Sequence, residues 1–296
     1  MLTTGTYTPH PNKGATLHPL WRFLISAIYV VGAQWTAEVF GTAVFPSHPL
    51  IADLLYRLAG CALLIGGFTF MLHVFDETDQ SPIAAMGLPR RSGWVREILL
   101  GIVIGASMVS LAVMAIVSFG RVTLAVHLNA AALFTGAVVF FLLLVGAMFE
   151  ELMFRGYPFQ RLLDGVGPVA AILAISAVFA GMHLFNPHTG GFWSLGFLNT
   201  ILAGVLFSVA YIRSRALWLP FGIHFGWNFA LGMVYGLPVS GLHRFSVIVS
   251  GSAEGSVLLT GGAYGVEASL TGAVVVVLGV LIVLVATRNC QQVRPE

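Results

Sequence analysis

The stretch Phe149-Glu150-Glu151-Leu152-Met153-Phe154-Arg155-Gly156-Tyr157-Pro158-Phe159-Gln160 places three charged residues inside an otherwise apolar part of the chain. Only 9 % of the residues are Asp, Glu, Lys or Arg, so two adjacent carboxylates followed by an arginine are a concentration of charge. A charged side chain in hydrocarbon costs about 2.5 to 3.5 kcal/mol even on the insertion scale, which makes intramembrane ionisable residues functional candidates.

The rest of the chain has the composition of a polytopic membrane protein. Apolar residues make up 57 % of the 296 residues, and the mean hydropathy is +0.91. These values exclude an ordinary soluble domain, because helices that are apolar on all sides suit a membrane or a very large core. No basic stripe with interleaved aromatic residues is present, so no nucleic-acid partner is expected. Cys61 and Cys290 fall outside any metal-ligand spacing and are expected to be free thiols.

Runs of about 20 apolar residues recur along the chain and predict an all-α fold of about eight transmembrane helices. The predicted spans are residues 20–41, 49–74, 96–119, 130–162, 168–186, 193–213, 216–236 and 267–288. We expect a single membrane domain over residues 17–290. A disordered cytoplasmic tail at residues 1–16 would precede it, and a short cytoplasmic tail at residues 291–296 would follow it.

Basic residues are distributed unequally between the loops that join these spans. Those on or near one side are Lys13, Arg22, Arg90, Arg91, Arg96, Arg155, Arg161, Arg213, Arg215, Arg288 and Arg294. Arg121 and Arg244 alone fall on the other side. The positive-inside rule therefore predicts that both termini are cytoplasmic, and a bacterial plasma membrane is the expected location. Asp53 and Arg57, four residues apart in the second span, have the spacing of an ion pair near the outer mouth.

Two of the loops are expected to contain short elements. The linker from Asp76 to Arg96 predicts a short interfacial helix around Ile83–Met86. The long outer loop 237–267 contains the apolar pieces Phe245–Val249 and Val257–Leu259, which predict a small hairpin.

Two histidines and an asparagine lie deep in the later spans. His183 closes the segment Phe179-Ala-Gly-Met-His183, and His224 and Asn228 lie four residues apart, hence on one helix face. The turn signal at residues 164–167 has similar numbers of residues between it and Glu150 on one side and His183 on the other. An antiparallel hairpin would therefore bring these two residues to nearly the same depth.

These residue types suit hydrolysis. A carboxylate and a histidine that share a water can act as a general base and its orienter, and a second histidine with an asparagine can stabilise an oxyanion. Glu150 and Glu151 point about 100° apart on a helix. Because Glu151 and Arg155 are four residues apart, they can pair on one face. We therefore expect Glu150 to be the base, with Glu151 and Arg155 forming a structural ion pair.

Three motifs follow one another on successive helices: Glu150-Glu151-x-x-x-Arg155, Phe179-x-x-x-His183 and His224-x-x-x-Asn228. In this order they resemble the motifs of the CPBP intramembrane proteases, a family of CAAX-processing and bacteriocin-processing enzymes that includes the type II CAAX prenyl endopeptidases. The resemblance covers about residues 131–236. It implies an eight-helix membrane fold and an endopeptidase site that opens towards the cytoplasm. It also implies that Glu150 and His183 activate water, while His224 and Asn228 support the oxyanion.

The sequence leaves an alternative open for the cofactor and for the function. Glu150, His183 and His224 are a chemically adequate zinc set, but no His-Glu-x-x-His motif is present, and ligation would occupy the base. A reaction without a cofactor is therefore expected, with zinc as the alternative. The expected partners are the lipid bilayer and a membrane-bound peptide or protein, whether prenylated or not. A proton-coupled transporter, which also uses carboxylate and histidine relays, and a non-catalytic scaffold or immunity protein are the competing functions.

Overall fold

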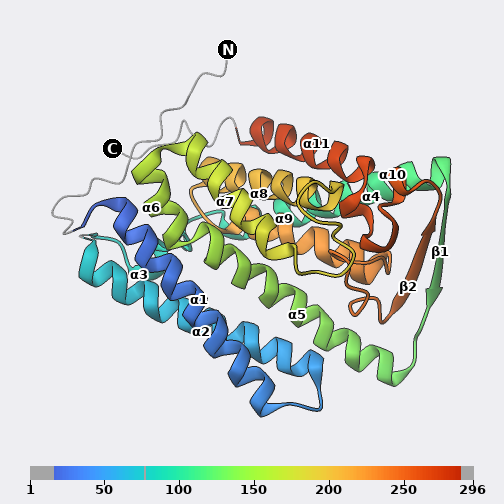
Figure 1. Ribbon diagram of the computed structural model, residues 1–296, viewed down its shortest axis with the longest axis horizontal. Coiled ribbons are helices and arrows are strands. Elements are labelled where there is room, and N and C mark those ends of the chain that lie inside the picture. The colour runs from blue at the N-terminus through green and yellow to red at the C-terminus, as the bar shows by residue number, and fades with distance from the viewer. Residues whose placement is uncertain (1–16, 77, 288–296) are drawn as a thin grey trace.

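The computed structural model describes residues 17–76 and 78–287, which form a helical bundle with a two-stranded sheet at one end (Figure 1). The first half contains α1 (Pro19–Val44), α2 (Pro49–Phe75), α3 (Pro82–Ala85), α4 (Trp94–Phe119), β1 (Arg121–Val126) and α5 (Ala130–Arg155). The second half contains α6 (Tyr157–Val166), α7 (Pro168–His183), α8 (Leu195–Ser214), α9 (Trp218–Phe229), η1 (Ala230–Val234), β2 (Val249–Glu254), α10 (Val257–Thr260), η2 (Gly262–Tyr264), η3 (Val266–Ala268) and α11 (Leu270–Ala286). The predicted tails at residues 1–16 and 291–296, and Cys290, lie outside the described residues.

Each predicted span contains a helix of the structure, but not every helix is long. Among the described residues, five helices are long and apolar enough to cross a membrane: α1, α2, α4, α8 and the α5–α6 pair taken together. The helices α7, α9 and α11 are shorter, with 16, 12 and 17 residues. The chain is thus an all-α membrane protein with several spans, and length and composition support five of the eight predicted ones.

The predicted span 130–162 is not one straight helix. The helix α5 ends at Arg155, and α6 starts at Tyr157, because Pro158 has no N–H to donate and Gly156 adopts ψ −141°. The corner is fixed by Asp76, whose Oδ2 accepts a hydrogen bond of 2.7 Å from the Tyr157 hydroxyl. Arg161 also pairs with Asp76. The α6 segment is therefore held against the end of α2.

The small sheet differs from the hairpin expected in the loop 237–267. β2 pairs antiparallel with β1, from Arg121 opposite Glu254 to Val126 opposite Val249. Residues 257–260 form α10 instead of a strand. The predicted hairpin is therefore wrong, because β1, more than 120 residues earlier, offers a Val- and Thr-containing strand that the bundle brings alongside. The short helix α3 does form where an interfacial helix was predicted.

Close packing of α4 against α9 fixes the helix that carries His224 and Asn228. A Cβ added to Gly101 would lie 2.8 Å from the Gly222 Cα, and one added to Gly226 would lie 2.7 Å from the Ile102 Cα. The two backbones are therefore in direct contact, as small residues four apart allow in membrane helices. The depth of α9 in the bundle follows from this contact.

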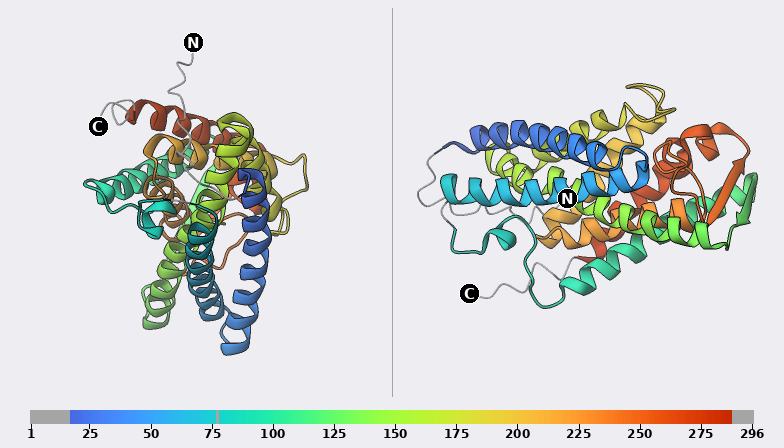
Figure 2. Two further views of the ribbon diagram at one scale, coloured as in Figure 1. Left: turned by 90° about the vertical axis from the view of Figure 1, so that its left-hand side faces the viewer. Right: turned by 90° about the horizontal axis from the view of Figure 1, so that it is seen from below.

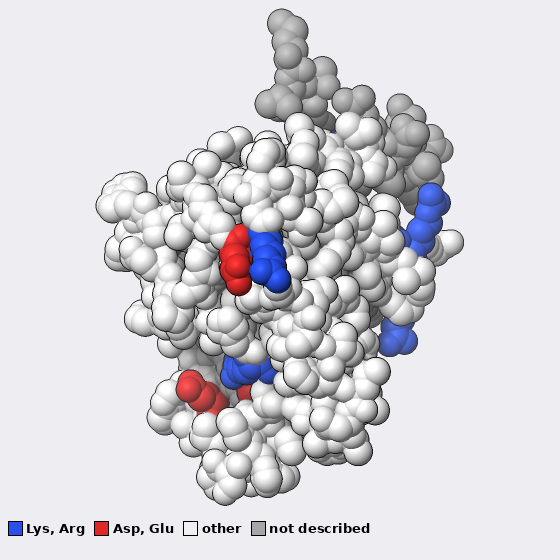
Figure 3. Space-filling view, turned by 90° about the vertical axis from the view of Figure 1, so that its right-hand side faces the viewer, with Lys and Arg blue, Asp and Glu red and all other residues white. Residues whose placement is uncertain are grey.

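The molecule has two distinct ends (Figures 1 and 2). At one, which we call the terminal end, α1 begins, α11 finishes and α6 turns into α7. At the other, which we call the sheet end, lie β1 and β2, together with the turn between α7 and α8 and the loop 237–248 on that side of the bundle. Figure 3 views the sheet end, where charged side chains are sparse.

Candidate active site

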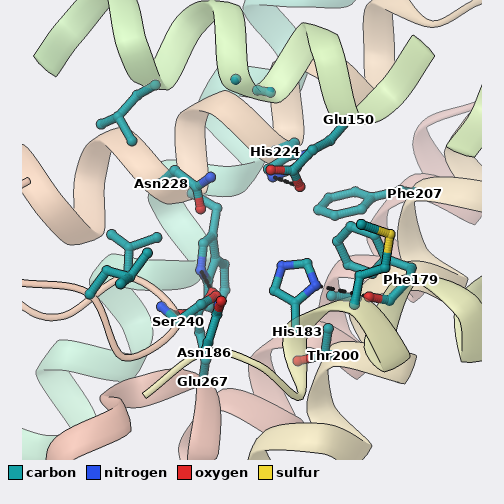
Figure 4. A pocket seen from close by; sticks show the side chains of 18 of the residues that line it. Glu150, Phe179, His183, Asn186, Thr200, Phe207, His224, Asn228, Ser240 and Glu267 are labelled. Carbon is teal, nitrogen blue, oxygen red and sulfur yellow. Dashed lines mark hydrogen bonds and ion pairs between the residues drawn. The ribbon is translucent and has the colours of Figure 1, made fainter. Parts of the chain in front are cut away.

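A cavity of about 290 Å³ lies among α2, α5, α7, α8 and α9. Its lining includes all four residues predicted to be catalytic: Glu150, His183, His224 and Asn228 (Figure 4). They come from α5, α7 and α9, so the three sequence motifs meet in one space. The structure thus brings together residues that are up to 78 positions apart in the chain.

The Glu150 carboxylate is held between an arginine and a histidine. Its Oε1 lies 3.3 Å from Arg57 Nη1, and its Oε2 lies 3.6 Å from His224 Nε2. The Glu150 side chain is 21 % exposed. Among the described residues, Oε2 has no hydrogen-bond partner. This oxygen is itself buried, and it is directed at His224.

The neighbouring Glu151 carboxylate is completely buried and holds two groups at once. Its Oε1 accepts a hydrogen bond of 2.9 Å from His224 Nδ1 and one of 3.4 Å from Arg155 Nη1. The Arg155 guanidinium also donates to the Gly204 carbonyl at 3.1 Å, and it lies 4.7 Å from the centre of the Phe179 ring. Glu151 therefore contacts His224 in addition to the predicted partner Arg155.

Aromatic rings fix the orientation of the His224 imidazole. Phe207 stacks on it with a centroid distance of 4.8 Å and an angle of 14° between the planes. Phe179 meets it edge-on at 6.3 Å. Such contacts restrict the ring to one orientation, so Nδ1 stays on Glu151 and Nε2 faces Glu150 and the cavity.

His183 is the last residue of α7 and presents one nitrogen to the cavity. Its Nδ1 lies 2.8 Å from the Phe179 carbonyl oxygen. A carbonyl only accepts hydrogen bonds, so Nδ1 carries a proton, and Nε2 is the ring nitrogen left for the cavity. Figure 4 shows the His183 ring and the Asn228 amide facing the same space. Asn228 is thus positioned on the wall opposite His183.

Several residues that sequence reasoning did not assign to the site also line the cavity, among them Arg57, Asn186 and Glu267. Arg57 was assigned only to Asp53, four residues away, and Asn186 only to a loop. Glu267 lies in η3, outside the helices that span the membrane. Its carboxylate accepts a hydrogen bond of 3.1 Å from Trp227 Nε1 and another from the Ser240 backbone N–H, and burial raises the pKa of Glu267.

The donor set does not fit the alternative of a bound zinc ion. Within the described part of the chain, no group of three or more His, Cys, Asp and Glu side chains is placed to hold a metal. Both His224 nitrogens face carboxylates, and His183 offers only Nε2. We therefore derive no step through a metal, and the expectation of a reaction without a cofactor stays a prediction.

The sheet end forms one wall of the cavity. This wall includes Val239, Ser240, Leu242, Arg244 and Phe245 of the loop 237–248. The predicted topology places this loop outside the cytoplasm, on the side opposite the termini. An opening on the side of this loop would therefore face away from the cytoplasm.

Comparison with known proteins supports the family. Residues 131–230 match the family model described as type II CAAX prenyl endopeptidase Rce1-like. No curated protein and no solved structure is significantly similar to the chain. The match spans about a third of the chain and includes every residue of the three motifs. Over residues 131–230, the match confirms the resemblance to the CPBP and CAAX protease family that these motifs predicted.

Proposed function

We propose that this protein is an intramembrane endopeptidase that hydrolyses a peptide bond of a membrane-associated peptide or protein. The observation that carries the proposal is the convergence of Glu150, His183, His224 and Asn228 on one cavity. The family match supports protease chemistry in the same region. A carboxylate, two imidazoles and an amide are sufficient for general acid–base catalysis with oxyanion stabilisation.

In the proposed reaction, Glu150 is the general base. The Glu150 carboxylate and the Nε2 lone pair of His183 accept hydrogen bonds from one water molecule. The water oxygen forms a bond to the carbonyl carbon of the substrate while its proton passes to Glu150. Glu150 then returns that proton to the leaving amine as the C–N bond breaks, which completes the hydrolysis.

His224 and Asn228 are proposed to stabilise the oxyanion. The Asn228 amide N–H can donate without any change of protonation. His224 already donates from Nδ1 to Glu151, so donation from Nε2 requires a proton on both nitrogens. The carboxylates of Glu150 and Glu151, on opposite sides of the ring, would stabilise that cation. The charge on His224 would then be available where the negative charge develops.

The arginine distribution supports cytoplasmic termini, and we therefore propose that the sheet end faces away from the cytoplasm. To test this, a single cysteine would replace the exposed His243 in a background without Cys61 and Cys290. A membrane-impermeant maleimide should label it in intact cells, whereas a cysteine at the exposed Thr78 should react only after lysis. The reverse pattern would place the loop-lined wall of the cavity in the cytoplasm.

The decisive experiment is turnover of a membrane-peptide library by the purified protein in detergent. We expect cleavage by the wild type, with the rate reduced about 10² to 10⁴-fold in Glu150→Gln, because the amide cannot act as a base. Glu38→Gln, which changes an exposed carboxylate on α1, is the matched control and should cleave normally.

Three results would contradict the proposal or its details. Normal turnover by Glu150→Gln would overturn the base assignment. Loss of wild-type turnover with a strong zinc chelator, restored by zinc, would overturn the metal-free mechanism. Complete absence of cleavage by the wild type across the library would favour the scaffold or transporter alternatives.

A further inference from the structure

We propose that Arg57 of α2 is a positioning residue for the Glu150 carboxylate, and that Gly146 of α5 provides the space that admits its guanidinium. This inference rests on the proposed role of Glu150 as the base. It extends the site beyond residues 131–230 to a helix that the family match does not include.

The geometry of Glu150 shows why such a residue is needed. Oε1 is bound by Arg57 Nη1 at 3.3 Å, whereas Oε2 is the oxygen that faces His224 and carries no hydrogen bond among the described residues. Holding Oε1 fixes the rotation of the carboxylate and keeps Oε2 directed at His224. Without this contact, the carboxylate would be free to turn, and its reactive lone pair would not be held in one direction.

Arg57 is itself held in place. Its Nε lies 3.2 Å from Asp53 Oδ1, one helical turn earlier on α2. The other oxygen of Asp53 lies 2.8 Å from Arg244 Nη2, in the loop at the sheet end. Charges of alternating sign thus run from Arg244 through Asp53 and Arg57 to Glu150. The Arg57 guanidinium therefore lies at the cavity wall with its direction already set.

Gly146 lies one helical turn before Glu150 and faces the same side of α5. A Cβ at this position would lie 2.7 Å from Arg57 Nη1 and 3.2 Å from Arg57 Cζ. A methyl group would therefore push the flexible tip of Arg57 away without striking a backbone. The guanidinium thus occupies the space that a side chain at residue 146 would fill.

A purely structural role would give a different result from a positioning role. If Arg57 only neutralised buried charge, displacing its tip would change stability and leave turnover of the folded protein intact. If it positions Glu150, displacement lowers kcat much more than it changes KM, because the carboxylate acts in the chemical step.

The test compares four variants by steady-state turnover and thermal unfolding in detergent. Gly146→Ala should reduce kcat about tenfold, with KM within about twofold and Tm equal to or above that of the wild type, since Ala favours helix over Gly. Arg57→Gln should reduce kcat about 100-fold, and Arg57→Lys should recover part of the loss. Gly66→Ala on α2, whose Cβ would meet nothing within 4 Å, is the matched control and should turn over normally.

Wild-type kcat in Gly146→Ala would overturn the proposal, as would wild-type kcat in Arg57→Gln. If Arg57→Gln does not fold, Gly146→Ala still decides, because it keeps every charge. Failure of the proposed function looks different: Glu150→Gln would then be as active as the wild type. An inactive Glu150→Gln beside fully active Arg57 and Gly146 variants would refute the positioning role alone.

Discussion

Two adjacent glutamates are each paired with an arginine, at almost equal distances but in different surroundings. The Glu151–Arg155 pair is 3.4 Å long, lies within one helix and has 0 % exposure on both side chains. The Glu150–Arg57 pair is 3.3 Å long, joins two helices and has 21 % and 16 % exposure. The distance does not distinguish the pairs, but access to the cavity does. The comparison indicates that a sealed pair supports the site, whereas the pair at the cavity wall can take part in the reaction.

Removal of one partner of the sealed pair should have the largest effect on the protein. Arg155→Ala should lower the free energy of unfolding by about 3 to 5 kcal/mol, because it leaves the Glu151 carboxylate buried without its cation. Arg57→Ala should cost clearly less, since water in the cavity can solvate Glu150. Thermal unfolding of both variants in detergent is the measurement. A normally folded but inactive Arg155→Ala would show that Arg155 belongs to the reaction.

A second test asks whether the sealed pair also serves catalysis. Glu151→Gln should reduce kcat by about 100-fold, because the neutral amide no longer stabilises a doubly protonated His224 as an oxyanion donor. The fold should persist, since the amide oxygen can still accept from His224 Nδ1. Steady-state kinetics with thermal unfolding separates the two effects. Unchanged kcat would reduce Glu151 to the purely structural partner that its spacing with Arg155 predicts.

A third test weakens the packing that both glutamates share. Phe207 stacks on His224, which lies between the two carboxylates. Phe207→Leu keeps most of the apolar volume but removes the ring contact, which is worth about 0.5 to 1.5 kcal/mol. We expect kcat to fall by up to about tenfold, with unchanged KM. A raised KM at constant kcat would instead show that Phe207 contacts the substrate.

Sequence reasoning succeeded where the relevant contacts are local or carried by a motif. The spacing of Glu151 and Arg155 on one helix turn predicted a pair because neighbours on a helix face are set by the 3.6-residue period. The order of the three motifs predicted the family. The glycines that let α4 and α9 touch are visible in the sequence, but nothing in it shows that these two helices pack on each other.

The missed features depend on packing between distant segments. Arg57 and Glu150 are 93 positions apart, and no periodicity links α2 to α5. The strand β2 pairs with β1 rather than with residues 257–259, because the bundle brings β1 closer. The corner at Gly156 was signalled by Pro158, but the continuous apolar pattern favoured a single span. Glu267 was missed because it stands alone in a loop without a motif.

Glu267 extends the comparison to a third carboxylate, whose hydrogen bonds come from the Trp227 indole and the Ser240 backbone N–H rather than from an arginine. Burial raises the pKa of Glu267 above its ordinary value. Above the ordinary glutamate pKa, the unfolded chain loses this proton while the folded protein still holds it. The contribution of Glu267 to stability therefore falls as pH rises from the ordinary glutamate pKa to the raised pKa of the folded protein.

Glu267→Gln removes this titration. The Tm of the wild type minus the Tm of the variant should therefore decrease as pH rises from about 4 to 8. Groups common to both proteins cancel in that difference, which leaves Glu267 as its source. The effect should be the smallest of the four, because the hydrogen bonds can persist in either protonation state. If this difference in Tm increased with pH instead, the folded protein would stabilise the ionised form of Glu267. The two N–H donors would then stabilise the ionised Glu267 carboxylate, as an arginine stabilises each of the carboxylates of Glu150 and Glu151.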